Sequence, residues 1–309
     1  MGRVVVAGGS GFIGQALARM LVSRGYDVAV LTRRLPAVEG VIEFAQWNGR
    51  TVGDWAHVLD GAVAIVNLTG KSVNCRHTPE NRREILASRV DSVRVLGEAI
   101  AHCTRPPNAF IQASGIGFYG DSGDRILDEK APAGGGFMAK VCQEWEGAFE
   151  RLELPATSKV ILRIGMVLGR SGGALAVLAR LTRLRLGGAA GDGRQFMSWI
   201  HRNDLNRMFA FAMERHDLTG PFNAVAPEPI TNAEFMRQLR RVLHRPWSPP
   251  TPAPLVRLGA WLMGTEGDLA LQSYRCISSR FVEAGFTFDY PQLTDALRNL
   301  YGMESRAAA

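Results

Sequence analysis

The sequence predicts an α/β fold, in which a doubly wound parallel sheet is followed by a smaller, mostly helical C-terminal lobe. Short apolar strand patterns alternate with amphipathic helix patterns through the first half of the chain. This alternation is typical of a parallel sheet covered by helices on both faces. A glycine-rich turn separates the first strand from the first helix. After Gly165 the alternation weakens, and glycine-rich stretches flank helical patterns instead.

The individual elements follow from the spacing of apolar residues. Apolar runs of strand length cover residues 4–7, 28–31, 62–68, 109–113, 160–164 and 222–225. Helical spacing runs from Phe12 to a stop at Gly25, then over 79–102 and 137–152. A strand and a helix return together at 196–213. The proline-dense stretch 246–254 is typical of an extended connector.

Composition excludes several classes of protein. Hydrophobic residues make up 46% of the 309 residues, which is enough for a sizeable core, and the apolar runs are too short and interrupted to predict a membrane span. The first residues lack the basic-then-apolar order of a signal peptide, because glycines follow too early. The four cysteines are scattered without a CxxC pair, so we expect no metal site and a reducing, cytoplasmic location. The net charge is +7, but its densest cluster, Arg180, Arg183 and Arg185, is typical of a solvated helix face, and we expect no nucleic-acid partner.

The glycine-rich turn has the spacing of a phosphate-binding loop. It comprises Gly8-Gly9-Ser10-Gly11-Phe12-Ile13-Gly14. In such a loop the first glycine permits a tight turn, the second lets the backbone approach a pyrophosphate, and the third lets the helix pack close to the sheet. The helix N-terminus then presents N–H groups and a partial positive charge to the phosphates. The turn therefore predicts a dinucleotide site on a Rossmann-type domain.

The end of the second strand distinguishes between the two nicotinamide cofactors. An NAD-binding protein usually has an acidic residue there, which binds the ribose hydroxyls. This chain instead has Thr32, Arg33 and Arg34. A guanidinium can hold a 2′-phosphate through two hydrogen bonds, so we predict NADP(H) as the cofactor.

The domain prediction follows from these elements. We assign an NADP-binding Rossmann domain to residues 1–165, completed by a returning segment at 196–226. Residues 166–195 and 227–309 are assigned to a substrate-binding C-terminal lobe. Ligands of doubly wound sheets bind beyond the carboxyl ends of the strands, so we expect the site there, between the two lobes.

Several segments resemble the extended short-chain dehydrogenase/reductase superfamily, in its NAD-dependent epimerase/dehydratase branch. The matching stretches are the glycine loop, 67–70, 113–120, 162–165 and 199–204. The segments NLTGKSVNCR, SWIHRNDL and GFTFDYPQLTDAL are more specific. They resemble an atypical epimerase group that carries an additional C-terminal domain of unknown function.

The chain lacks a pair of catalytic residues that the superfamily uses. The superfamily uses a Tyr-x-x-x-Lys pair, in which the lysine lowers the pKa of the tyrosine that transfers the proton. The chain contains no Tyr-x-x-x-Lys. The favoured register of the helix at 137–152 places Met138 in the tyrosine position and Cys142 in the lysine position. Shifting the register by one, to Phe137 and Val141, or by two, to Gly136 and Lys140, does not restore the tyrosine.

Two further positions depart from the superfamily pattern. Arg89 replaces an asparagine on the helix after the fourth strand, and Gly115 stands where the superfamily has a serine or threonine. The neighbouring Ser114 can serve instead, although a shift of one position at a strand end turns the side chain. We therefore predict Ser114, Arg89 and Cys142 as catalytic candidates, with the Lys71–Arg76 loop and His201 as alternatives. The residues predicted to bind the cofactor, several of them from the resemblance alone, are Gly8, Ser10, Gly11, Phe12, Ile13, Gly14, Thr32, Arg33, Arg34, Leu68, Thr69, Glu84, Arg89 and Arg163.

The function expected from these residues is NADP(H)-dependent oxidoreductase, epimerase or dehydratase-like chemistry on an unidentified small molecule. The alternative is an NADP(H)-binding redox sensor or scaffold with little or no catalysis, because the proton-transferring tyrosine is missing. A second copy of the chain is a candidate partner, in a homodimer.

Overall fold

The computed structural model describes residues 1–36, 40–245 and 247–302. Its central element is a seven-stranded, wholly parallel sheet in the order β11-β7-β5-β4-β1-β2-β3. The strands are β1 (Arg3–Ala7), β2 (Asp27–Thr32), β3 (Glu43–Gln46), β4 (Ala64–Asn67), β5 (Ala109–Gly115), β7 (Ser158–Ile164) and β11 (Gly220–Ala224). The connections run outward in both directions from β1 and β4, which confirms the predicted doubly wound fold.

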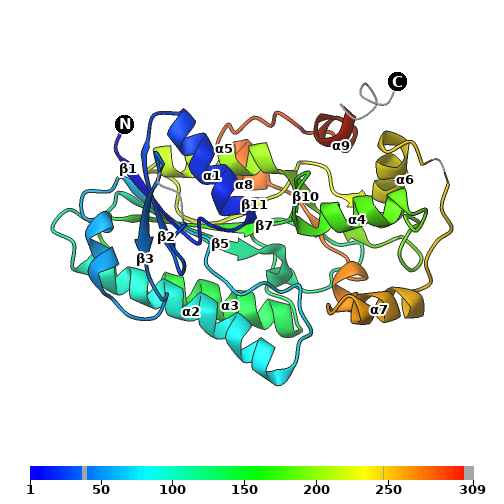
Figure 1. Cartoon of the computed structure of the whole chain (residues 1–309), viewed down its shortest axis with the longest axis horizontal. Coiled ribbons are helices and arrows are strands. Elements are labelled where there is room, and N and C mark those ends of the chain that lie inside the picture. Colours follow the sequence, from blue (N-terminus) through cyan, green and yellow to red (C-terminus); the bar gives the residue numbers. More distant parts are fainter. Residues whose placement is uncertain (37–39, 246, 303–309) are drawn as a thin grey trace.

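Helices cover both faces of this sheet (Figure 1). Helices α2 (Pro79–Ala101) and α3 (Phe137–Glu150) lie side by side on one face. Helices α1 (Phe12–Ser23), α5 (Arg202–Glu214) and the short α8 (Ser279–Glu283) cover the other. Successive side chains of β1 point to opposite faces of the sheet. Val4 and Val6 pack with α1 and α5, and Val5 packs with α2 and α3.

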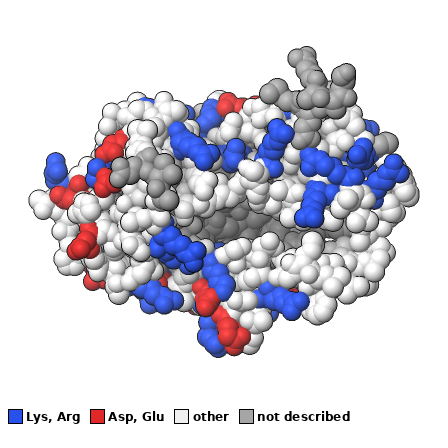
Figure 2. Space-filling model, in the orientation of Figure 1, with Lys and Arg blue, Asp and Glu red and all other residues white. Residues whose placement is uncertain are grey.

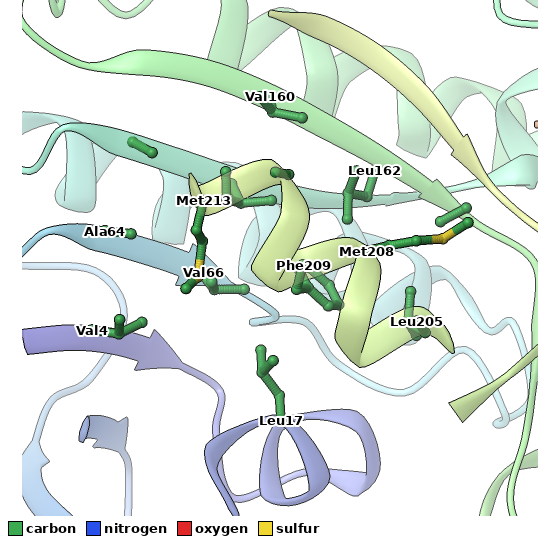
Figure 3. Packing of buried hydrophobic residues seen from close by; sticks show 14 of the residues in the cluster. Val4, Leu17, Ala64, Val66, Val160, Leu162, Leu205, Met208, Phe209 and Met213 are labelled. Atoms are coloured by element: carbon green, nitrogen blue, oxygen red, sulfur yellow. The ribbon is translucent and has the colours of Figure 1, made fainter. Parts of the chain in front are cut away.

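Figure 3 shows the core between the sheet and α5. Phe209 of α5 is fully buried and lies with Met208 and Met213 over the sheet residues, while Leu17 of α1 approaches from the side. These apolar side chains recur at helical spacing, which explains why α5 forms and which face it buries. A fully buried side chain of this size contributes about 1.5–3 kcal/mol to folding.

The C-terminal lobe is mostly helical. It contains α4 (Gly173–Arg183), α6 (Asn232–Val242), α7 (Ala253–Leu262) and α9 (Leu293–Tyr301). A second core cluster joins α4, α6 and α9 through Leu175, Phe235 and Leu297. Three small two-stranded sheets in the described residues lie between this lobe and the sheet domain. They pair β8 (Met166–Leu168) with β10 (Trp199–His201), β9 (Phe196–Met197) with β12 (Ile230–Thr231), and β6 (Ile126–Leu127) with β13 (Arg275–Cys276).

The chain returns from the C-terminal lobe to the main sheet. Phe281 of α8 and Phe286 belong to the same core cluster as β1, although the sequence assigns both to the second lobe. The edge strand β3 has no counterpart among the predicted strands. The described part of the 246–254 connector starts at residue 247, since residue 246 lies outside the described ranges. Among the described residues, no helix is both long enough and apolar enough to cross a membrane.

Candidate functional site

The carboxyl ends of the central strands meet at a hollow in the surface. Figure 2 shows this hollow in the middle of one face, and lysine and arginine side chains lie around much of its rim. Helix α1 begins and β5 ends beside it (Figure 1). A separate depression, lined by Asn108, Ser158 and Lys159, lies at the amino ends of β5 and β7. It is therefore at the wrong edge of the sheet for a site built on the glycine loop.

The glycine loop has the geometry that a pyrophosphate requires. Gly8 has φ +77°, and a β-carbon there would lie 2.9 Å from the carbonyl carbon of Leu68. A β-carbon on Gly14 would lie 2.5 Å from the Cα of Gly9. No side chain caps α1, and its first turn holds no acidic residue. The loop therefore leaves the helix N-terminus open to an anion.

The end of β2 is tied to this loop. The Thr32 hydroxyl is buried, lies 3.4 Å from the Ser10 hydroxyl, and donates to the carbonyl oxygen of Arg34 at 3.1 Å. Arg33 and Arg34 follow on the surface, and both are exposed. The predicted 2′-phosphate residues thus adjoin the loop on the solvent side of the site. Glu39, which is the first acidic residue after β2, lies outside the described residues.

The end of β4 forms the floor beside the glycine loop. The Leu68 N–H donates to the carbonyl of Ala7 at 2.9 Å, which holds the two strand ends together. The Thr69 hydroxyl oxygen is buried and makes no hydrogen bond within the described residues. Its position under the loop makes it available to a ligand, because a buried polar atom normally has a partner.

Arg89 and Glu84 hold the segment after β4. The Arg89 guanidinium donates to the carbonyls of Lys71 at 3.0 Å and of Ile85 at 2.9 Å. Glu84 is largely exposed and forms an ion pair with Lys71, whose hydrogen bond lowers the pKa of that carboxyl. Arg89 therefore supports the backbone of the site, and Glu84 orients the ammonium of Lys71.

A buried ion pair lies at the ends of β5 and β7. Arg163 donates to both carboxylate oxygens of Glu146 at 2.8–3.2 Å, and each residue is less than 5% exposed. The Ser114 hydroxyl donates to the same carboxylate at 2.6 Å. Arg163 also donates to the Tyr119 hydroxyl at 2.9 Å, and that hydroxyl donates to Asn223 at 2.7 Å.

This network determines what the predicted residues in it can do. Ser114 points toward Glu146, so its hydroxyl is engaged with a protein carboxylate. Arg163 is 4% exposed and bonded on every nitrogen, so its guanidinium holds Glu146 and Tyr119 in place. Burial raises the pKa of Tyr119 to about 12, so this phenol stays neutral. Sequence reasoning did not identify Glu146, because its only signal is one acidic residue on the buried face of α3.

Met138 and Cys142 lie one helical turn apart on α3, facing the 3₁₀ turn Ile116–Tyr119 that follows β5. A β-carbon on Gly117 would lie 3.4 Å from the Met138 β-carbon and 3.8 Å from the Cys142 sulfur. Cys142 is 2% exposed. Burial, and secondarily the Glu146 carboxylate, raises the pKa of its thiol to about 11. Cys142 is therefore a neutral thiol near neutral pH.

This environment predicts slow modification of Cys142 by thiol reagents. With a pKa of about 11, roughly one thiol in a thousand or fewer is ionised at pH 7.5, and only the thiolate reacts. We expect iodoacetamide to label Cys75, which is partly exposed, well before Cys142 in the folded protein. Peptide mass spectrometry measures both sites, and labelling of Cys142 should rise as the pH approaches 11. Equal labelling of the two cysteines at pH 7.5 would contradict this.

The loop after β4 reaches across to the C-terminal lobe. The Arg76 guanidinium lies 4.8 Å from the centre of the Trp261 ring and donates to the Trp261 carbonyl at 3.2 Å. The backbone N–H of His77 donates to the Glu266 carboxylate at 2.7 Å. The loop after β4 is thus joined to the segment around Trp261 and Glu266. The side chains of Lys71 and Arg76 both already interact with other protein groups.

His201 has a structural environment. It is 1% exposed, its Nδ1 accepts a hydrogen bond from the Asn203 N–H at the start of α5, and its ring stacks on Tyr290. Burial lowers its pKa to about 4. The described ranges contain no cluster of three His, Cys, Asp or Glu residues arranged to hold a metal ion.

The parallel sheet, its open glycine loop and the helix cover on both faces define a Rossmann-type dinucleotide-binding protein. Residues 4–225 match the model of the NAD dependent epimerase/dehydratase family, and residues 251–300 match a domain of unknown function, DUF1731. The chain belongs to this family, and the pair of domains confirms the predicted resemblance to the atypical epimerase group.

Relatives and solved structures agree over nearly the whole chain. The chloroplastic epimerase family protein SDR39U1 homolog of Arabidopsis thaliana is 34% identical, with 96% of this chain and 85% of the relative covered. The crystal structure of human epimerase family protein SDR39U1 with NADPH has a TM-score of 0.87 at 32% identity, and covers 97% of this chain and 99% of its own. A nucleoside-diphosphate sugar epimerase from Corynebacterium glutamicum has a TM-score of 0.77 at 30% identity, with 97% and 58% covered.

Proposed function

We propose that this protein binds NADP(H) and catalyses hydride transfer to or from a carbonyl or alcohol carbon of a small molecule. The observation that carries the cofactor assignment is the open glycine loop, next to a strand end that has arginines in place of an acid. The similar human protein was crystallised with NADPH, which supports the same choice of cofactor.

The residues present fit the cofactor. A β-carbon at Gly11 would meet only the Gly8 carbonyl oxygen, at 3.4 Å, so the space above this residue is open on the ligand side. The N–H groups at the start of α1 would bind the pyrophosphate there, and Arg33 or Arg34 would bind the 2′-phosphate. Leu68 and Thr69 would lie under the nicotinamide half. When bound, the nicotinamide supplies or accepts the hydride.

The chain's own residues fix the backbone around the site and line it. Arg89 holds the backbone at Lys71, while the Glu146–Arg163 pair fixes the ends of β5 and β7. Met138 and Phe118 add apolar surface near the turn after β5, and the contact between Arg76 and Trp261 ties the loop after β4 to the C-terminal lobe. Fixed strand ends and loops hold a bound nicotinamide and a substrate in one geometry, which favours hydride transfer.

A redox sensor without catalysis is the second candidate. The observation in its favour is that Ser114 donates to Glu146 and that the Cys142 thiol is neutral and buried. Neither group is then poised to exchange a proton with a substrate. Steady oxidation of NADPH with a panel of small ketones and diketones supports the enzyme, and tight NADPH binding with no turnover across the panel supports the sensor.

The choice of NADPH over NADH is expected to depend on Arg33. The parent protein should bind NADPH roughly tenfold or more tightly than NADH, because one charge-assisted clamp contributes about 1.5–3 kcal/mol. Arg33→Ala should remove most of this preference and leave NADH affinity unchanged. Titration of reduced-cofactor fluorescence measures both constants, with the exposed Arg19→Ala as the control. Equal affinity of the parent for both cofactors would contradict the assignment.

A further inference from the structure

A tyrosine from the C-terminal part of the chain borders the candidate site. Tyr274 directly precedes β13 and packs against a small cluster that includes Ile116 and Tyr119, the two ends of the turn after β5. Its backbone is fixed, since its N–H donates to Phe196 at 2.9 Å and its carbonyl accepts from the Ser198 hydroxyl at 2.7 Å. The residue as a whole is half-buried.

Tyr274 and Cys142 flank the same turn. The Cys142 sulfur lies on the α3 side, 3.8 Å from where a β-carbon on Gly117 would stand. Burial raises the pKa of the Tyr274 phenol above its usual range, and the nearby Cys142 and Asp121 add to this shift. In the favoured register Cys142 marks the lysine position of the missing Tyr-x-x-x-Lys pair. A neutral phenol and the α3 residues Met138 and Cys142 therefore pack around the same turn after β5.

The Tyr274 hydroxyl has a partner that a substrate can replace. It donates to the side-chain carbonyl oxygen of Gln272 at 2.5 Å. Gln272 is itself partly exposed, and its amide oxygen is the same kind of acceptor as a ketone oxygen. Exchanging one carbonyl acceptor for another keeps the phenol hydrogen-bonded throughout.

The other four of the chain's five tyrosines are placed differently. Tyr119 is 1% exposed and bonded to Arg163 and Asn223. Tyr26 precedes β2 at the amino edge of the sheet, and its hydroxyl donates to Glu214. Tyr290 stacks on His201, and Tyr301 is buried in the cluster of α4, α6 and α9.

We propose that Tyr274 is the catalytic proton donor of this site, supplied by the C-terminal domain in place of the missing tyrosine on α3. The proposal rests on the proposed reductase function. Reduction of a ketone forms a C–H bond with the hydride that NADPH supplies and an O–H bond with the proton of Tyr274. NADP⁺ and an alcohol leave, and the phenolate takes a proton back from water. An alkoxide is a much stronger base than a phenolate, so this transfer is favourable even from a weakly acidic phenol.

The kinetic test compares Tyr274→Phe with the parent, using NADPH and 1-phenyl-1,2-propanedione. The phenyl ring keeps its packing, so NADPH affinity and the circular dichroism spectrum should not change. The value of kcat should fall 10²- to 10⁴-fold, the usual contribution of a general acid. Parent turnover should stay flat between pH 6 and 9, because the phenol remains protonated. Tyr290→Phe, which removes a phenol outside the site, should retain parental kcat.

A second measurement does not need turnover. Vibrational difference spectroscopy of the ¹³C-labelled diketone in the NADP⁺ complex reports the hydrogen bond to its carbonyl. We expect a shift to lower frequency in the parent and in Tyr290→Phe, and none in Tyr274→Phe. A carbonyl shift that is lost in Tyr274→Phe, in a parent that shows no turnover, would leave Tyr274 as a hydrogen-bond donor to the bound carbonyl and overturn the proposed reductase and, with it, the proton transfer. If the parent turns over and Tyr274→Phe keeps both the parental kcat and the carbonyl shift, the role of Tyr274 alone is overturned.

Discussion

The substitution Gly11→Val is expected to abolish NADPH binding while leaving the protein folded. The only group near a β-carbon at this position is the Gly8 carbonyl oxygen, at 3.4 Å, so the backbone tolerates a side chain. A branched side chain would instead fill the space that the pyrophosphate needs, directly over the open N-terminus of α1. We expect the dissociation constant to rise at least a hundredfold, because the loss combines steric exclusion with loss of the helix N–H contacts.

Isothermal titration of NADPH measures this effect, and thermal unfolding reports the fold. The matched control is Gly259→Val on α7, where a β-carbon would meet nothing within 4 Å. This control should bind NADPH like the parent. Normal binding by a folded Gly11→Val variant would show that the phosphates bind elsewhere.

Removing one partner of the buried ion pair should produce the largest loss of stability. The Glu146 carboxylate is 3% exposed, and in Arg163→Met the Ser114 hydroxyl is its one remaining side-chain donor among the described residues. An uncompensated charge in such a place lowers the free energy of unfolding by about 3–5 kcal/mol. Urea unfolding followed by circular dichroism measures this change directly.

The double variant Arg163→Met with Glu146→Leu is the matched control. It removes both charges, so it should recover much of the lost stability, since paired buried charges can often be replaced by apolar residues. It should not recover function, because Tyr119 and Ser114 lose the partners that fix the turn after β5. A loss below about 1 kcal/mol in Arg163→Met would show that the carboxylate is hydrated or protonated there.

The sheet and the glycine loop could be predicted because local patterns specify them. Each buried strand from β1 to β7 is a short apolar run, and the loop glycines have fixed spacing within the first turn of α1. Strand β3 was not predicted because its four residues, EFAQ, include two polar ones and it lies at the sheet edge. Edge strands carry weaker apolar patterns, since one side of the strand faces solvent.

The candidate site was harder to predict because it depends on contacts between distant residues. Ser114 turns toward Glu146, which lies 32 positions further along the chain. Tyr274 approaches the turn after β5 from beyond β12, and no local spacing links it to the glycine loop. Sequence spacing reports neighbours on one helix or strand, whereas these side chains meet only through the tertiary fold.

The return of the chain to its first domain affects how the protein is made. Phe281 and Phe286 complete the core that β1 and α1 begin, yet they are translated more than 250 residues later. A nascent chain that has emerged only as far as β11 holds every strand of the sheet but leaves the α8 side of β11 uncovered. Synthesis adds roughly 5–20 residues per second, so this apolar surface stays exposed for several seconds before α8 arrives. We therefore expect the ribosome-bound chain to be prone to aggregation until α8 covers this surface.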